Sequence, residues 1–260
     1  MINTIKQFAV LPSVLMFFSF SSLHAEALVT DRPDATESSS VVAPHFFQYE
    51  VGATAFEDRE GVGGLESFGS LLRVGVRENL ELRFGWGGYL DSDTESGVND
   101  AMLGFKYYLA SEDGLRPEAA ILVHVSLPIG DTELSSDALD PDFLLSFSHT
   151  LSEQLSLGYN LGGKVETSER ANGNETTLSS AVYSVALGYT ISDQLGAYAE
   201  VFGSIGLSAD ESPASFDAGL TWLINDDQQI DCFVGTGLNN DADKWMAGIG
   251  YSIRWPSSRN

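Results

Sequence analysis

A few histidines and serines are the residues of this chain that could supply a nucleophile or a general base. Of the four histidines, His124 would share a strand face with Ser126, because side chains two residues apart point the same way. No third catalytic group can be identified from the sequence. Ser148 and His149 are adjacent, so on a strand they point to opposite faces and cannot share a proton. His45 stands at an expected strand start, at the membrane interface. No Gly-x-Ser-x-Gly, zinc or phosphate-loop motif is present, so we expect no enzyme, with a lipid hydrolase as an alternative.

Metal and nucleic-acid sites are also disfavoured. The segment 91–95 resembles a calcium loop only superficially, because Met102 stands where the bidentate Glu should be. Cys232 is the single cysteine, which excludes an intrachain disulfide and a cysteine metal cluster. The 13 basic and 37 acidic residues give a net charge of −24, which repels nucleic acid. We therefore expect no cofactor, no metal and no nucleic-acid partner.

The elements that must position these side chains are strands. Apolar and polar residues alternate with a period of two in segments of about ten residues, as in transmembrane strands. In residues 80–87, Leu and aromatic side chains occupy one face, and Glu81, Arg83 and glycines occupy the other. A soluble sandwich would place Lys and Glu on its water-facing side, whereas this polar face is rich in glycine. Small residues suit the inner face of a narrow barrel, and the apolar face would then contact lipid.

Turn spacing gives the number of strands. Five short turns and six longer acidic loops would join about twelve antiparallel strands, an even number as single-chain bacterial barrels require. In hydrocarbon every backbone polar group needs a partner, so the sheet must close. The fold class is therefore an all-β, transmembrane, up-and-down barrel in the bacterial outer membrane, with both termini periplasmic. The expected strands are 45–56, 66–76, 80–90, 99–109, 117–127, 142–151, 155–165, 177–191, 195–205, 215–224, 229–236 and 245–255.

The chain divides into four parts. Residues 1–25 have the positive start and short apolar run of a signal peptide, and residues 26–44 form an N-terminal segment, a leader or a plug. The barrel covers 45–255 and a tail covers 256–260. Gly250, Ile253 and Trp255 in the final strand resemble the signal read by the outer-membrane assembly machinery.

Charged residues of the polar face would line the lumen. Isolated charges there are costly, so they should pair or be hydrated. They would form either a solvated lumen with structural ion pairs, or facing rows whose transverse field selects solutes. A twelve-stranded lumen is narrow, so we expect a small or gated passage. The candidates are Glu50, Arg73, Glu81, Arg83, Lys106, Glu118, Lys164, Glu200, Asp217, Asp231 and Arg254.

The segment Asp31-Arg32-Pro33-Asp34 precedes the first strand. It is too short to form a domain, and Pro33 keeps it extended. One hypothesis is that it folds into the periplasmic mouth, where Arg32 meets a lumen carboxylate such as Glu50 or Asp231. The alternative is a flexible leader.

Several motifs resemble one known family. They are residues 30–34 with 45–50, Ser126-Leu127-Pro128-Ile129-Gly130, residues 229–239 and residues 248–254. Together they resemble the phenol meta-pathway (MetA, FapF-like) outer-membrane transporter family. The resemblance implies an outer-membrane barrel that transports aromatic or other hydrophobic compounds, while one branch of the family exports amyloid subunits.

These observations together favour an outer-membrane channel or transporter for small hydrophobic or aromatic solutes, passive or gated. The alternative is a structural or secretion barrel that binds a partner chain or a surface ligand. The expected partners are outer-membrane lipid and lipopolysaccharide, the barrel-assembly machinery and small hydrophobic solutes.

Overall fold

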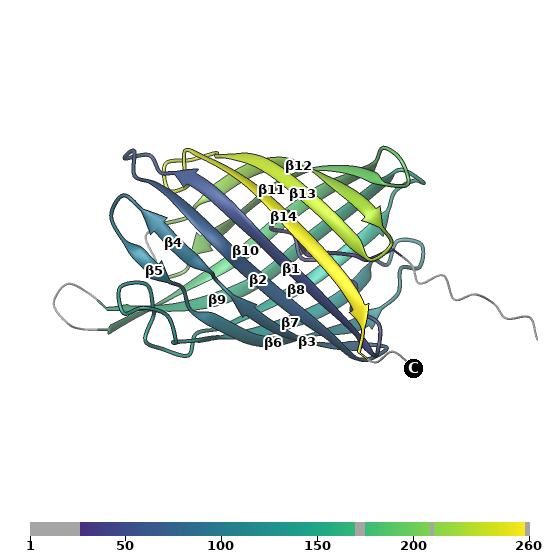
Figure 1. The fold of residues 1–260 in the computed structure, drawn as a ribbon, viewed down its shortest axis with the longest axis horizontal. Coiled ribbons are helices and arrows are strands. Elements are labelled where there is room, and N and C mark those ends of the chain that lie inside the picture. The colour runs from purple at the N-terminus through teal and green to yellow at the C-terminus, as the bar shows by residue number, and fades with distance from the viewer. Residues whose placement is uncertain (1–26, 170–174, 209–210, 258–260) are drawn as a thin grey trace, which may run out of the picture.

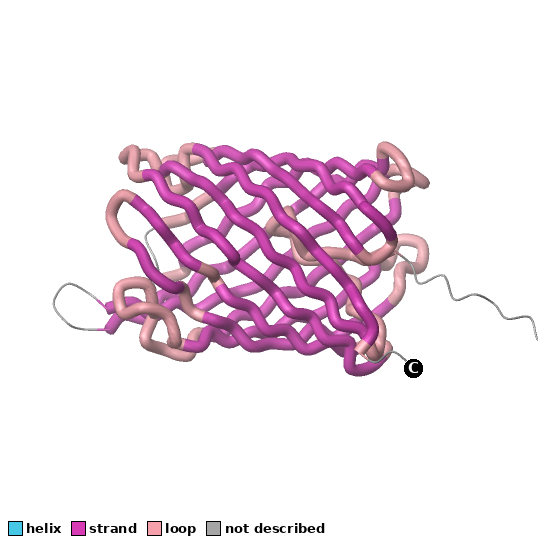
Figure 2. Tube along the Cα trace, viewed as in Figure 1, coloured by secondary structure: helices cyan, strands magenta, loops and turns pink. Residues whose placement is uncertain are grey.

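The structure is a computed structural model that describes residues 27–169, 175–208 and 211–257. In this part of the chain, strands and loops form one antiparallel sheet that closes into a tilted barrel (Figures 1 and 2). No helix among these residues has the length and apolarity that crossing a membrane would require. The expected signal peptide, residues 1–25, lies outside the described residues.

The sheet contains fourteen strand segments that make twelve barrel strands. β3 and β4 both pair with β2, and β5 pairs with β4 while β6 pairs with β3. Each of these two pairs, β3 with β4 and β5 with β6, therefore forms one interrupted barrel strand. The segments are β1 (Phe46–Glu57), β2 (Gly63–Arg77), β3 (Leu80–Trp86), β4 (Tyr89–Ser92), β5 (Ser96–Val98), β6 (Ala101–Ala110), β7 (Glu118–Leu127), β8 (Pro141–Thr150), β9 (Leu155–Glu169), β10 (Glu175–Thr190), β11 (Leu195–Gly206), β12 (Ala214–Asn225), β13 (Gln228–Gly237) and β14 (Trp245–Pro256).

The twelve-strand prediction is confirmed, but the expected continuous strand 80–90 is broken into β3 and β4, whereas the expected strand 99–109 corresponds to β6, with the short β5 before it. The break in 80–90 falls at Gly88, whose φ is +81°, a conformation that residues other than glycine rarely adopt. A Cβ at Gly88 would also lie 2.2 Å from the carbonyl oxygen of Ser67. Opposite this break, Phe68 adopts a φ of 62° beside an irregularity in the pairing of β1 with β2. A local bulge of this kind is invisible to a simple alternation pattern.

The first and last strands close the barrel. β1 pairs with β14 along its whole length, from Phe46 opposite Pro256 to Glu57 opposite Trp245, and its other edge pairs with β2. Trp255 stacks on Phe47 across this seam, with ring centroids 5.9 Å apart. Every barrel strand therefore has a neighbour on both sides, as a sheet in hydrocarbon requires.

The two faces of the barrel are inverted relative to a soluble protein. Leu82, Phe84 and Phe105 are among many large apolar side chains that are exposed on the outside. The most buried large side chains are instead charged, including Arg73 and Arg83 at 0% exposure. This pattern fits an outer wall solvated by lipid and an inner wall that must satisfy its own charges.

The turns between strands differ at the two ends of the barrel. The short-turn end carries the turns 78–79, 151–154, 191–194 and 226–227, and the long-loop end carries loops such as 128–140. Both ends of the described chain lie at the short-turn end, where Ser257 N donates to His45 O at 2.6 Å and Leu28 N donates to Asp226 O at 2.8 Å. The C-terminus is marked there in Figure 1.

The residues before β1 fold back into the barrel. Residues 27–44, here named the lumen segment, contact inward-facing side chains from β1 to β13. In Figure 2 this segment is the pink loop that crosses the interior behind the near strands. The centre of the molecule is thus a polar network between the lumen segment and the inner wall.

Candidate functional site

Three cations on neighbouring strands form a basic wall inside the lumen: Arg73 on β2, Arg83 on β3 and Lys106 on β6. All three have 0% exposure, and Arg73 lies directly opposite Arg83 in the β2–β3 pair. Like charges placed opposite each other destabilise a sheet, so carboxylates must neutralise them. Glu81 does so from the same wall, accepting from Arg73 Nε at 2.8 Å and from Arg83 Nη1 at 3.1 Å.

Asp31 of the lumen segment completes this neutralisation. Its carboxylate accepts from Arg83 Nη1 at 2.6 Å and Lys106 Nζ at 2.9 Å, and it forms an ion pair with Arg73 Nη1 at 3.1 Å. Burial by itself would raise the pKa of Asp31, but the three cations outweigh it and hold that pKa well below its usual value. Glu37 adds a second carboxylate, which accepts from Arg83 Nη2 at 2.9 and 2.8 Å. The lumen segment is therefore bound to the basic wall by two anions.

Glu50 on β1 holds the backbone of the same segment. Its carboxylate accepts from Asp31 N at 3.0 Å and Arg32 N at 3.1 Å, and it also pairs with Arg73 at 3.2 Å. A carboxylate that receives two backbone N–H groups and one guanidinium fixes both the position and the direction of the chain.

An acidic wall faces the other side of the segment: Glu200 on β11, Asp217 on β12 and Asp231 on β13. Glu200 accepts from the backbone N–H groups of Ala35 and Thr36 and from Thr36 Oγ1 at 2.7 Å. Asp34 also lies in this region, and no cation among the described residues forms an ion pair with it. Burial, and then the negative charge of Glu200, raise the pKa of Asp34 well above its usual value.

Arg32 crosses to the acidic wall through a slot between two glycines. Its Nη2 donates to Asp231 Oδ1 at 3.3 Å and to the carbonyl oxygen of Ile249 at 3.1 Å. Gly52 and Gly250 are paired across the β1–β14 seam, and a Cβ at either would lie 2.3 Å from the guanidinium group of Arg32. Gly250, which the sequence assigned to an assembly signal, thus also makes room for this side chain. Of the two carboxylates expected for Arg32, Asp231 meets its side chain and Glu50 meets its backbone.

The two walls lie on roughly opposite sides of the barrel, since β2, β3 and β6 are separated from β11, β12 and β13 by two strands in one direction, β1 and β14, and by four in the other, β7 to β10. The Asp31 and Glu37 carboxylates meet the basic wall, whereas the Arg32 side chain and the backbone N–H groups of Ala35 and Thr36 meet the acidic wall. The segment is therefore electrostatically complementary to the field across the lumen.

The remaining lumen candidates lie around this network. Glu118 accepts from Ser39 Oγ of the lumen segment at 2.6 Å. Lys164 is partly exposed and pairs with Glu166 at 2.8 Å. Arg254 pairs with Asp227 at 2.8 Å near the short-turn end.

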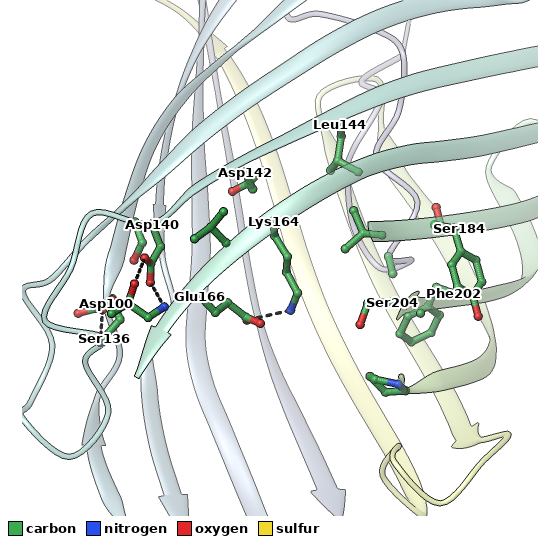
Figure 3. Close-up of a pocket in the computed structure, with 18 of the residues that line it drawn as sticks. Asp100, Ser136, Asp140, Asp142, Leu144, Lys164, Glu166, Ser184, Phe202 and Ser204 are labelled. Atoms are coloured by element: carbon green, nitrogen blue, oxygen red, sulfur yellow. Dashed lines mark hydrogen bonds and ion pairs between the residues drawn. The ribbon is translucent and has the colours of Figure 1, made fainter. Parts of the chain in front are cut away.

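A cavity of about 880 Å³ occupies the lumen between the long loop 128–140 and Ala35 of the lumen segment. Its wall includes apolar side chains on three strands, Leu144 on β8, Val182 on β10 and Phe202 on β11. Serine and threonine hydroxyls, acidic side chains, Asn160 and Lys164 also line it. Figure 3 shows Leu144 and Phe202 with Ser184 and Ser204 toward one side, and Asp100, Ser136 and Asp140 toward the other. The volume lies within the usual range for small-molecule sites, about 300–1,000 Å³.

The structure also supplies a partner for His124 that the sequence did not reveal. Asp142 lies opposite it in the β7–β8 pair, and His124 Nδ1 is 2.9 Å from Asp142 Oδ1. Among the described residues, however, His124 Nε2 has no hydrogen-bond partner, so the Ser126 hydroxyl is not bonded to it. His149 lies 3.7 Å from Glu112 and stacks on Tyr159. Within the described ranges, no group of three or more His, Cys, Asp or Glu side chains is placed to hold a metal.

Comparisons with known proteins agree with this architecture. The NanC porin structure matches with a TM-score of 0.58 at 9% identity, over 80% of this chain and 98% of that chain. The KdgM porin matches with a TM-score of 0.51 at 10% identity, over 79% of this chain and 98% of that chain. At such identities the likeness shows the fold alone. A search of curated proteins finds no match. A family model covers residues 30–255, and the chain therefore belongs to the family described as "Putative MetA-pathway of phenol degradation".

Proposed function

We propose that this outer-membrane barrel is a gated channel for small, uncharged hydrophobic or aromatic solutes, and that the lumen segment is its gate. The observation that carries the proposal is the cavity of about 880 Å³ that ends on Ala35 of the lumen segment. A solute arriving from the long-loop end would meet an open vestibule and then the docked segment. Passage would require the segment to move.

The lining of the cavity supports this class of solute. Leu144, Val182 and Phe202 provide a small apolar surface on an inner wall that is largely polar, and an aromatic ring could stack on Phe202. Glycine at position 162, which pairs with both Leu144 and Val182, keeps the wall flat between them. The hydroxyl groups nearby could bind a phenolic oxygen.

The charge of the vestibule favours uncharged solutes over anions. Its lining includes Asp140, Asp142 and Glu166 but only one lysine, Lys164. The whole chain carries a net charge of −24. Such a surface lowers the local concentration of anions. The proposal involves no catalytic step, and it places the short-turn end in the periplasm.

A bilayer experiment tests this function. The mature wild-type protein and a variant lacking residues 26–40 would be compared for single-channel conductance and for phenol uptake into liposomes. We expect low conductance and slow uptake for the wild type and a large increase for the deletion variant. Heat-modifiable mobility on gels is the control for a folded barrel.

Two further outcomes of the same experiment are informative. Phe202→Ser in the deletion variant should slow phenol uptake while leaving ion conductance unchanged. A folded deletion variant that neither conducts ions nor takes up phenol would contradict the channel and favour a structural or secretion barrel.

A further inference from the structure

We propose that the basic wall is a binding site for a small carboxylate anion, and that the lumen segment occupies this site with its own Asp31 and Glu37. The proposal rests on the proposed function in one respect, because the site becomes free only when the segment leaves the lumen. It adds a ligand that differs in class from the uncharged solutes above.

The geometry of the bound segment shows that a carboxylate fits. The two oxygens of Asp31 lie 2.6 Å from Arg83 Nη1, 2.9 Å from Lys106 Nζ and 3.1 Å from Arg73 Nη1. All three cations are fully buried, and Asp31 is nearly so. Hydrogen bonds between ionised groups at these distances are the strong ones in proteins.

Two of the three cations, Lys106 and Arg83, depend on the lumen segment for hydrogen-bond partners. Within the described residues, Lys106 Nζ donates all of its hydrogen bonds to the lumen segment, at Asp31 and Ser38. Arg83 Nη2 donates only to Glu37, although Arg83 Nη1 keeps Glu81 at 3.1 Å. Withdrawal of the segment would therefore leave Lys106 Nζ and Arg83 Nη2 without the hydrogen-bond partners that they have among the described residues.

The charge balance of the basic wall also indicates that it requires an anion from outside the barrel wall. In the part of the barrel that the structure describes, these three cations form ion pairs with two carboxylates, Glu50 and Glu81. An unpaired charge on a protein wall is costly unless it is hydrated or recruits a counter-ion. A carboxylate is the anion that matches the planar fork of an arginine. The emptied lumen should therefore bind a carboxylate where Asp31 had been.

The site faces the short-turn end and lies away from the acidic loops. Glu81 is the second residue of β3, and Arg73 lies four residues before the end of β2, on either side of the turn 78–79. An anion could thus reach the basic wall without passing the acidic vestibule.

The tethered segment competes strongly for this site. A group held by a short linker acts at an effective concentration on the order of millimolar or more. Free carboxylate should therefore bind the full-length chain much more weakly than a chain whose segment is absent. This competition also means that carboxylate binding would favour the open channel.

The test measures binding in detergent solution by isothermal titration calorimetry. The probe is benzoate, and benzamide is its uncharged control. The variant lacking residues 26–40 is compared with the same variant carrying Arg83→Gln and Lys106→Gln, and with the wild type. We expect benzoate to bind the deletion variant, and the two glutamines to weaken that binding about ten- to hundredfold, as for lost hydrogen bonds to charged groups. Benzamide and the wild type should give little heat.

Several outcomes would overturn the proposal: no benzoate binding to the folded deletion variant, equal binding of benzamide, or binding unaffected by the two glutamines. If the deletion variant does not fold, full-length protein with Asp31→Asn and Glu37→Gln replaces it, with the same expectations and the same refutations. Conductance of the same samples reports separately on the proposed function. Benzoate binding without conductance would contradict the channel alone, and conductance without benzoate binding would contradict this inference alone.

Discussion

Asp31→Asn is the substitution that most directly perturbs the docked lumen segment. The change keeps the shape of the side chain and removes the charge that meets Arg73, Arg83 and Lys106 at 2.6–3.1 Å. At pH 7 this carboxylate is ionised, because its pKa is held below the usual value. The change destabilises the docked state but not the undocked state, because Asp31 would be hydrated once the segment is undocked.

The size of the effect follows from the burial of the pair. Removing one partner of a buried ion pair costs about 3–5 kcal/mol. Asparagine retains one acceptor oxygen, so we take the lower end, about 3 kcal/mol. Since each 1.4 kcal/mol is a factor of about ten, the ratio of docked to undocked segment should fall about a hundredfold. A channel that is about 99% closed would become about half open.

Single-channel recording in planar bilayers measures this open fraction. Asp34→Asn is the matched control, because burial and Glu200 raise the pKa of Asp34 and thereby favour an uncharged side chain that asparagine imitates. The control should not open the channel. If Asp31→Asn protein shows native heat-modifiable mobility and a wild-type open fraction, the lumen segment is not held by this charge network and the reasoning fails.

Four further expectations concern other parts of the network. Gly52→Ala should displace the Arg32 guanidinium, which lies 2.3 Å from the added Cβ. The open fraction of the channel should rise while the midpoint of urea unfolding stays the same, and an unchanged open fraction would contradict the role of the two glycines. Glu200→Gln, which weakens three hydrogen bonds from the segment, should also raise the open fraction, and a tighter gate would contradict this. The pKa of Asp34 in the docked segment is raised above its ordinary value of 3.8, so its contribution to docking is fully present below pH 3.8 and is lost as the pH rises through the docked pKa. The open fraction of the channel should therefore increase with pH. In bilayer recordings, Asp34→Asn should reduce this pH dependence. Phe105→Arg on the lipid face should destabilise the barrel by up to about 2–4 kcal/mol if the position lies near the midplane, as measured by urea unfolding in lipid vesicles. An unchanged stability would contradict the assignment of this face to lipid.

The strands were predictable because their signal is local. A period of two assigns each side chain to one face, and a slip of one residue would exchange the lipid-facing and lumen-facing sets. Residues 80–87 show this most clearly, with Leu82 and Phe84 exposed outside and Glu81 and Arg83 buried inside. The same pattern could not reveal the break at Gly88, since that break comes from backbone geometry rather than from polarity.

The partners within the lumen were much less predictable. His124 and Asp142 meet because β7 and β8 pair in one register, and the long loop between these strands conceals that register in the sequence. The pairing of Gly52 with Gly250 depends on closure of the barrel between the first and last strands. Neither relation leaves a periodic trace in the chain.

The sequence by itself determined a closed twelve-stranded barrel, its two faces and the set of charged residues suited to its inner wall, because hydrocarbon imposes these features strand by strand. Only the tertiary structure decided which charges meet. It brought Asp31 to Arg83 and Lys106, across 52 and 75 residues of chain, and Arg32 to Asp231 across 199. Such contacts depend on a lumen that exists only after closure, and on a segment with no regular structure of its own, so elementary pattern rules could propose them but not select among them.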